Sequence, residues 1–113
     1  MKIVDVRSVT CRVPVERPTA ISTRKIGGRE YVVVWIDTDA GVTGVGYTYA
    51  GTVGGRATEA LVVDALRPLL LGEDPTHVER HWAAMYQETL LAGRRGAAIR
   101  AISAVDIALW DLL

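Results

Sequence analysis

The sequence predicts an α+β fold in which a three-stranded antiparallel meander is followed by about three helices. The first half of the chain is rich in β-branched residues, which gather in short runs separated by turn residues. The second half instead carries apolar residues at the three- and four-residue spacing of amphipathic helices. A length of 113 residues is typical of one domain, so we expect residues 1–113 to form a single domain.

The first predicted strand covers residues 3–13, where apolar and polar side chains alternate at its end. Pro14 and Pro18 follow and are expected to stop this strand, because proline cannot donate to a strand ladder. The next segment, residues 15–29, is polar with two glycines near its end, and we expect it to be a mobile loop. A loop of about 15 residues in a compact domain is usually functional or disordered.

The second predicted strand, residues 31–37, is a continuous apolar run, which is typical of a strand buried on both faces. A turn at residues 38–41 leads into the third strand, residues 42–49. Gly44 and Gly46 weaken this third strand and indicate either a bulge or the close approach of another backbone.

Two helices are predicted in the middle of the chain. The first begins near Arg56, and Pro68 should kink or end it. The second begins after Pro75, where Thr76 and Glu79 have the spacing of a capping box. Its predicted apolar stripe consists of Val78, Trp82, Met85, Tyr86 and Leu90.

A third predicted helix, residues 97–113, is apolar nearly all round. A helix of this kind is normally buried on every side. Because a small sheet and two short helices cannot cover all of it, we expect further polypeptide or another subunit to pack against this helix.

Composition excludes several classes of function. Thirteen basic and thirteen acidic residues cancel, and no basic stripe forms, so we expect no nucleic-acid partner. No apolar stretch reaches the ~20 residues that cross a bilayer, and the N-terminus does not read as a signal peptide, so we expect no membrane partner. Cys11 is the only cysteine, which predicts a reducing, cytoplasmic location and a packing role as a small hydrophobe.

Two pairs of titratable residues on the predicted helices are candidates for a metal site or for acid/base catalysis. His77 and His81 are four residues apart, but a third metal ligand and the metalloprotease Glu are missing, so we interpret them as a solvated flank. Asp106 and Asp111 suit either an acid/base pair or buried polar residues that hold helix ends or loops by hydrogen bonds. Five residues turn a helix by about 140° beyond one full turn, so the two side chains diverge and the second alternative is favoured.

Hydroxyl-bearing and basic side chains gather in the first loop and after the third strand. Hydroxyls can bond sugar hydroxyls, and a cation can bond a carboxylate, so these segments suit a polar anionic ligand. The same composition equally suits two ordinary solvated loops. The candidate substrate-binding residues are Thr23, Arg24, Lys25, Tyr47, Tyr49 and Thr52.

Three stretches stand in a distinctive order: TDAGVTGVGYTY at residues 38–49, LRPLLLGEDP at 66–75 and AISAVDIALWDLL at 101–113. Together they resemble the N-terminal capping domain of the mandelate racemase and muconate lactonizing branch of the enolase superfamily. The last stretch resembles the signature helix of that family and is the most specific. With the opening MKIVDV strand, the resemblance covers essentially the whole chain.

This resemblance implies a cap whose two loops, residues 15–29 and 47–55, close over a substrate held by a (β/α) barrel. The barrel is absent from this chain, so no residue here is expected to be a catalytic group or a metal ligand. In the family, Mg²⁺ is bound by the barrel and stabilises an enediolate. Many relatives carry Glu where this chain has Tyr47, which favours racemase-like and sugar-acid dehydratase members.

Two functions follow as expectations. In the first, the chain is the capping and specificity domain of a Mg²⁺-dependent lyase or isomerase that abstracts a proton α to the carboxylate of an acid sugar. The parent protein is then expected to be a homo-oligomer. In the second, the chain is a stand-alone binding or oligomerisation module that uses its apolar third helix as an interface.

Overall fold

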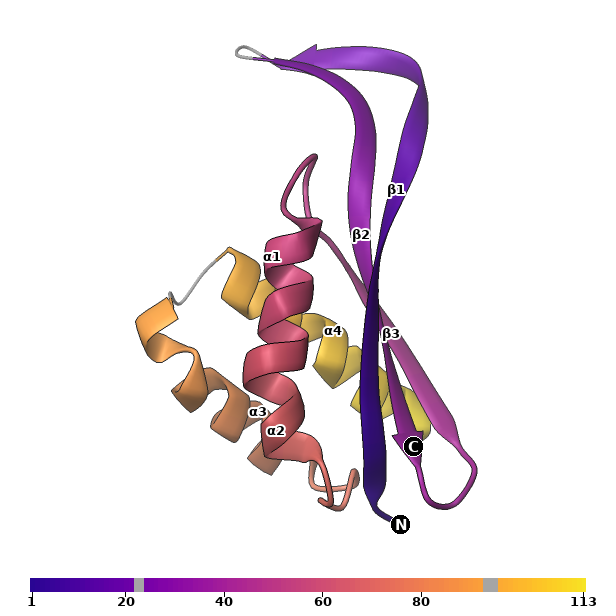
Figure 1. The fold of residues 1–113 in the computed structure, drawn as a ribbon, viewed down its shortest axis with the longest axis vertical. Coiled ribbons are helices and arrows are strands. Elements are labelled where there is room, and N and C mark those ends of the chain that lie inside the picture. Colours follow the sequence, from indigo (N-terminus) through magenta and orange to yellow (C-terminus); the bar gives the residue numbers. More distant parts are fainter. Residues whose placement is uncertain (22–23, 93–95) are drawn as a thin grey trace.

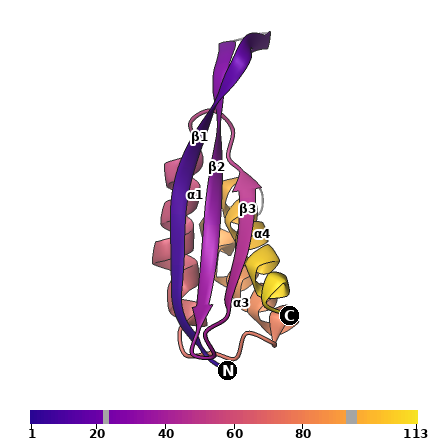
Figure 2. The ribbon, with the colours of Figure 1, turned by 90° about the vertical axis from the view of Figure 1, so that its right-hand side faces the viewer.

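The computed structural model describes residues 1–21, 24–92 and 96–113. Its sheet contains β1 (Ile3–Ile21), β2 (Arg24–Thr38) and β3 (Thr43–Tyr49), in that order and all antiparallel. The helices follow in the sequence and cover one face of the sheet, so the fold has two layers (Figures 1 and 2). The predicted α+β class, a three-stranded antiparallel meander followed by helices, is confirmed.

The prediction of a loop over residues 15–29 was wrong, because β1 and β2 continue through this region as a hairpin. Ile21 pairs with Arg24 at its far end. The pairing shifts register between Pro14 and Thr19, so β1 carries more residues here than β2. β1 is an edge strand, and an edge strand tolerates proline because its outward amides have no ladder partner.

The second strand is buried on one face only, which corrects the prediction of burial on both. Val32, Val34 and Ile36 are fully buried under the helices. Their neighbours Tyr31, Val33 and Trp35 are half-buried on the opposite face of the sheet, which no helix of the described chain covers. Cys11, expected to be a packed small hydrophobe, is exposed. It pairs with Tyr31 in the ladder.

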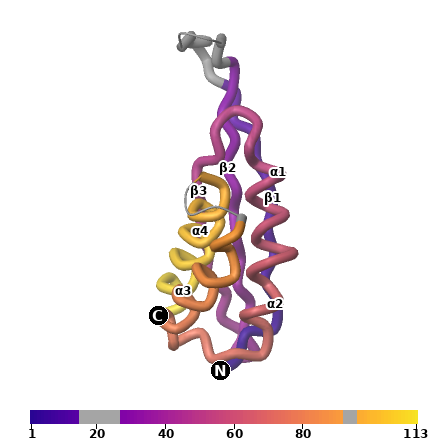
Figure 3. Tube along the Cα trace, turned by 90° about the vertical axis from the view of Figure 1, so that its left-hand side faces the viewer, coloured from indigo at the N-terminus to yellow at the C-terminus, as the bar shows by residue number. Residues whose placement is uncertain are grey.

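The first helix runs from Gly55 to Leu70 and changes type twice. It consists of α1 (Gly55–Ala60), a π-helical segment η1 (Leu61–Leu66) and α2 (Arg67–Leu70). Pro68 lies in the first turn of α2, immediately after the π segment, where its missing N–H is tolerated. The helix ends two residues later, where Leu71 adopts an extended conformation with ψ of 128°. Figure 3 shows this helix and the last one side by side under the sheet.

The second helix, α3 (Val78–Glu88), starts without the predicted capping box. Its N-cap is His77, which makes no side-chain capping bond. Thr76 bonds backwards instead, donating its amide and hydroxyl to Asp74 Oδ1 at 2.9 and 2.7 Å. Aspartate side chains compete effectively for such nearby donors, and this turn delays the start of the helix.

The buried stripe of α3 differs from the predicted one at two residues. His81 is 3% exposed, whereas Trp82 is 38% exposed and stacks on the ring of Tyr86. His81 therefore does not belong to a solvated flank, and its Nε2 donates to the carbonyl of Asp74 at 2.7 Å. His77 is exposed, as expected.

The short helix η2 (Leu90–Ala92) precedes α4 (Ala97–Leu112), which lies against β3. A Cβ at Gly46 would be 2.7 Å from the amide nitrogen of Ala108, so main chain packs on main chain. The close backbone approach predicted from the two strand glycines is confirmed. Seven α4 residues are buried, and a stripe with Ile107 and Trp110 remains exposed.

None of the helices in the described residues combines the length and apolar character that a membrane span needs.

Candidate functional site

The first predicted group of binding residues lies at the far end of the β1–β2 hairpin. Thr23 lies outside the described residues. Arg24 and Lys25 begin β2, where they pair with Ile21 and Ala20, and their side chains lie outside the described part of the chain. A role of these three residues in substrate binding therefore stays a prediction.

Two residues of the second predicted group, Tyr47 and Tyr49, are brought together on the face of the sheet that the helices leave open, and Thr52 lies in the segment that follows β3. Tyr47 and Tyr49 are alternate residues of β3, so both side chains point to this face. Tyr31 of β2 pairs with Tyr49, and its ring centroid lies 5.6 Å from that of Tyr49 and 6.3 Å from that of Tyr47. Tyr47 is 60% exposed and Tyr49 is 39% exposed. We call these three residues the tyrosine cluster.

Arg100 joins the tyrosine cluster from the first turn of α4. Its guanidinium carbon lies 5.6 Å from the centroid of the Tyr49 ring, within the range of a cation–π interaction. No pattern in the sequence pointed to Arg100, because 51 positions separate it from Tyr49 and only the packing of α4 on β3 brings them together. Tyr31 was missed as well, although alternation along β2 would have placed it on the same face as Tyr47 and Tyr49.

The segment that joins β3 to α1, residues 50–54, is firmly attached to the strands beside it. Glu30 accounts for three hydrogen bonds: its amide donates to Gly51 O at 2.7 Å, its carbonyl accepts from Ala50 N at 2.8 Å, and its Oε1 accepts from Gly55 N at 2.9 Å. Arg12 Nη1 adds a bond to the carbonyl of Thr52 at 3.1 Å. This segment is therefore an ordered platform beside the tyrosine cluster.

Glu30 also stabilises the start of the helix that follows this segment. Gly54 is the N-cap of α1 and has no side chain to accept a bond, so the carboxylate of Glu30 supplies the acceptor. A negative charge at this position is favoured by the positive end of the helix dipole. The anchoring role of Glu30 could not be seen in the sequence, because 25 residues separate it from Gly55.

The two aspartates of α4 have different surroundings. Asp111 Oδ2 accepts a hydrogen bond from the amide of Val45 at 2.9 Å, which confirms the hydrogen-bonding part of the favoured alternative, but Asp111 is exposed and not buried as predicted. Asp106 is half-buried, and this burial raises the pKa of its carboxyl above the ordinary value of 3.8. Asp111 is exposed and bonded to β3, so the structure does not bring the pair together for proton transfer.

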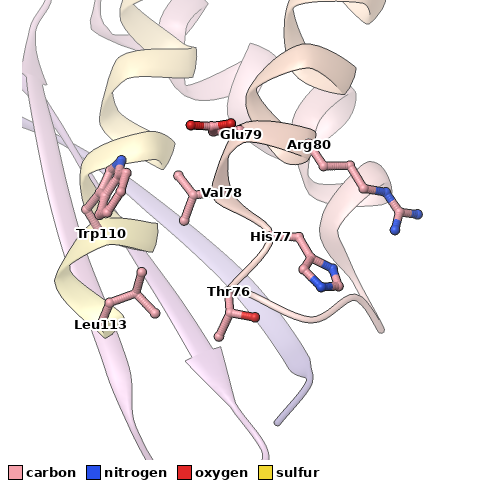
Figure 4. A pocket seen from close by; sticks show the side chains of 7 residues that line it. All are labelled: Thr76, His77, Val78, Glu79, Arg80, Trp110 and Leu113. Atoms are coloured by element: carbon pink, nitrogen blue, oxygen red, sulfur yellow. The ribbon is translucent and has the colours of Figure 1, made fainter.

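An open hollow of about 460 Å³ lies between the start of α3 and the end of α4. Figure 4 shows Val78, Trp110 and Leu113 on one side and His77 and Arg80 farther out. Thirteen helical residues separate Leu113 from Arg100, which corresponds to about 20 Å. The hollow is therefore distinct from the tyrosine cluster, and its lining includes apolar side chains that are 57 and 62% exposed at Trp110 and Leu113.

The described residues do not provide a set of ligands for a magnesium ion. Over residues 1–21, 24–92 and 96–113, no group of three or more His, Cys, Asp or Glu side chains is placed to hold a metal ion. This part of the chain therefore does not fit a magnesium site.

Comparison with known proteins places the whole arrangement in one family. The family model for the N-terminal domain of mandelate racemase and muconate lactonizing enzyme matches residues 3–113. The chain is 43% identical over 110 residues to 3,6-anhydro-alpha-L-galactonate cycloisomerase of Streptomyces coelicolor. That match covers 95% of this chain and 30% of the relative.

Solved structures agree with this match. A racemase from Streptomyces coelicolor, solved with bound magnesium, superposes with a TM-score of 0.92 at 42% identity, over 97% of this chain and 31% of the other. L-Talarate dehydratase from Polaromonas, in complex with Mg and L-glucarate, superposes with a TM-score of 0.89 at 30% identity, over 98% of this chain and 31% of the other. The chain thus spans just under a third of the length of these relatives. It belongs to the family of N-terminal domains of mandelate racemase and muconate lactonizing enzyme, in the enolase superfamily.

Proposed function

We propose that this chain is the substrate-capping and specificity domain of an enzyme that abstracts a proton α to the carboxylate of an acid sugar. The observation that carries the proposal is the position of Tyr47, Tyr49 and Arg100 beside the anchored segment of residues 50–54. Phenol hydroxyls can bond sugar hydroxyls, and a guanidinium can bond a carboxylate. Relatives named for sugar acids support this substrate class.

The rigidity of the cap residues supports a role in substrate recognition. A group that is already held in its binding conformation loses less entropy when a ligand arrives. Glu30 and Arg12 fix the segment of residues 50–54, and Tyr31 packs against the rings of Tyr47 and Tyr49. A cap built in this way can exclude water from a bound substrate while contributing no reacting group.

The complete protein is proposed to be a lyase of the dehydratase type or an isomerase of the racemase or epimerase type. Its proton-abstracting groups and its Mg²⁺ would belong to a barrel domain outside this chain. Support for Mg²⁺ comes from the relatives solved with this ion. A cytoplasmic location and a homo-oligomeric state are part of the same proposal.

A stand-alone binding or oligomerisation module is the second candidate function. The observation that favours it is the exposed apolar stripe of α4, where Ile107 is 46% and Trp110 is 57% exposed. Sedimentation of the 113-residue chain distinguishes this candidate. A dimer that Trp110→Glu dissociates supports it, whereas a well-folded soluble monomer contradicts it.

The capping function is tested on the complete protein with magnesium and a panel of acid sugars. We expect turnover of at least one of them, and we expect Tyr49→Ala to lower kcat/KM for it about tenfold or more, the size of one lost buried contact. Trp82→Ala, which removes an exposed aromatic ring from α3, is the matched control and should leave kcat/KM within about twofold. Equal kcat/KM values for wild type and Tyr49→Ala on every substrate would refute the recognition role.

A further inference from the structure

Two arginines lie over aromatic rings of the sheet, and they differ in their partners. Arg7 lies 5.3 Å from the centroid of the Trp35 ring and also forms an ion pair with Asp37 at 2.7 Å. Arg100 lies 5.6 Å from the centroid of the Tyr49 ring, and no carboxylate of the described residues forms an ion pair with it. The N–H donors of Arg100 are therefore available for another group, whereas those of Arg7 already bind a carboxylate.

Arg100 is held in position by the fold. Its amide donates to the carbonyl of Gly96 at 3.1 Å, so its backbone is fixed in the first turn of α4. The main chain of α4 lies so close to Gly46 of β3 that a Cβ at Gly46 would collide with it. The guanidinium rests on the Tyr49 ring, and an arginine supported by an aromatic face still presents the N–H groups at its edge.

The surroundings of Arg100 suit an anionic, hydroxyl-rich ligand. A guanidinium matches the two oxygens of a carboxylate, and this geometry is the reason arginine is common where carboxylates are recognised. Tyr47 and Tyr49 add hydroxyl groups that can donate and accept. Tyr47 is 60% exposed, so the cluster is accessible from the open face of the sheet.

We infer that Arg100 binds the second carboxylate of an aldarate, at the end of the substrate remote from the carbon that loses its proton. The inference rests on the proposed capping function and deepens it, because it selects between two classes of acid sugar. Under the proposed function, the reacting carbon and the carboxylate next to it are held by groups outside this chain. A cap closes over the part of the substrate that those groups leave free. An aldarate carries a carboxylate there, whereas an aldonate carries a neutral hydroxymethyl group.

The test compares galactarate with galactonate on the complete protein, in wild type, Arg100→Gln, Arg100→Lys and Arg7→Gln. Both kcat/KM and the dissociation constant from titration calorimetry are measured. Arg100→Gln should weaken galactarate binding and lower its kcat/KM by about tenfold to a hundredfold, the range for one charge-assisted contact. Galactonate should change by less than about threefold, because it has no remote carboxylate. Arg100→Lys keeps the charge without the planar fork and should lose less.

Arg7→Gln is the matched control, because it removes another ring-stacked arginine from the same sheet and should leave both sugars within about twofold of wild type. An equal loss on galactarate and galactonate in Arg100→Gln would show a structural role and overturn the inference. No loss, or a wild-type protein that neither binds nor converts galactarate, overturns it as well. If wild type converts galactonate alone, the proposed function stands and the Arg100 inference fails. If galactarate binds through Arg100 and no acid sugar is converted, Arg100 binds a carboxylate, but the proposed function fails and with it the assignment of Arg100 to the remote end of a substrate.

Discussion

Gly46 of β3 lies directly against the main chain of Ala104 in α4, so closely that a Cβ at Gly46 would collide with the carbonyl oxygen of Ala104. Neither partner can move a side chain aside, because the contact is between a strand backbone and a helix backbone. The same contact sets the distance between α4 and β3, and that distance in turn places Arg100 over Tyr49.

Gly46→Ala should lower the free energy of unfolding by about 3 kcal/mol, the upper part of the range for inserting a methyl group into a packed core. Chemical denaturation of wild type and Gly46→Ala measures this change, provided that the two proteins have equal m values. Gly27→Ala is the control, since a Cβ at Gly27 would meet no atom within 4 Å, and it should shift stability by less than about 0.5 kcal/mol. Equal stabilities for the two variants would show that the helix can retreat from the strand.

Glu30→Ala should destabilise the protein by about 1 to 2 kcal/mol, because it removes the acceptor for the amide of Gly55 at the start of α1. Amide hydrogen exchange should also accelerate locally in residues 50–58. Glu88→Ala removes an exposed carboxylate from the end of α3 and serves as the control. Unchanged exchange at Gly55 in Glu30→Ala would mean that the carboxylate does not anchor the segment.

His81→Ala should lower the free energy of unfolding by about 2 to 4 kcal/mol, because it removes a buried ring and leaves the carbonyl of Asp74 with only the long bond from the His77 amide at 3.4 Å. His77→Ala, four residues earlier and exposed, should change the free energy of unfolding by less than about 0.5 kcal/mol. Thermal and urea unfolding of the pair measure the difference. A His81→Ala variant as stable as His77→Ala would contradict the buried hydrogen bond.

Arg7→Gln should change how stability depends on acid pH. The hydrogen bond from Arg7, followed by one from Thr43, holds the pKa of Asp37 below its ordinary value of 3.8. A lowered folded-state pKa contributes stability that is present above that ordinary value and is lost as the pH falls through the folded-state pKa. The stability difference between wild type and Arg7→Gln should therefore be largest near neutral pH and shrink below about pH 4.

The carboxyl carbon chemical shift of Asp37, followed by NMR as the pH is lowered, reports this pKa directly. The pKa of Asp37 should rise toward 3.8 in Arg7→Gln. It should stay at its wild-type value in Arg80→Gln, which changes an exposed arginine of α3. Identical titration curves for wild type and Arg7→Gln would show that the ion pair with Arg7 does not lower the pKa of Asp37.

Strand order and helix order were predictable from the sequence, because each depends on local periodicity and on short connections between neighbouring elements. The length of the β1–β2 hairpin was not predictable, since Pro14 and Pro18 read as terminators and become tolerable only when β1 is known to be an edge strand. Burial on α3 failed for a similar reason. His81 and Trp82 are neighbours at the margin of one helical face, and the rotation of the helix against the core decides which of them is buried.

The candidate site was predictable in part. Tyr47 and Tyr49 lie in the strand with the two glycines and Thr52 follows it, so a local pattern pointed to all three. Arg100, Glu30 and Arg12 act on the same region from other elements, and their contacts depend on tertiary packing that no local pattern encodes.

The π-helical segment keeps one row of residues of the first helix facing the sheet along the whole length of the helix. Thr58, Val62, Leu66 and Leu70 are all buried at intervals of four residues. In a pure α-helix each such interval overshoots one turn by about 40°, so this row would wind off the core. The wider turns of η1 rotate less per residue and cancel part of the overshoot. The π segment therefore acts as a spacer between the two ends of this helix: Leu66 and Leu70 stay on the core at one end, while Glu59 accepts a hydrogen bond from the Thr10 hydroxyl at 2.6 Å near the other.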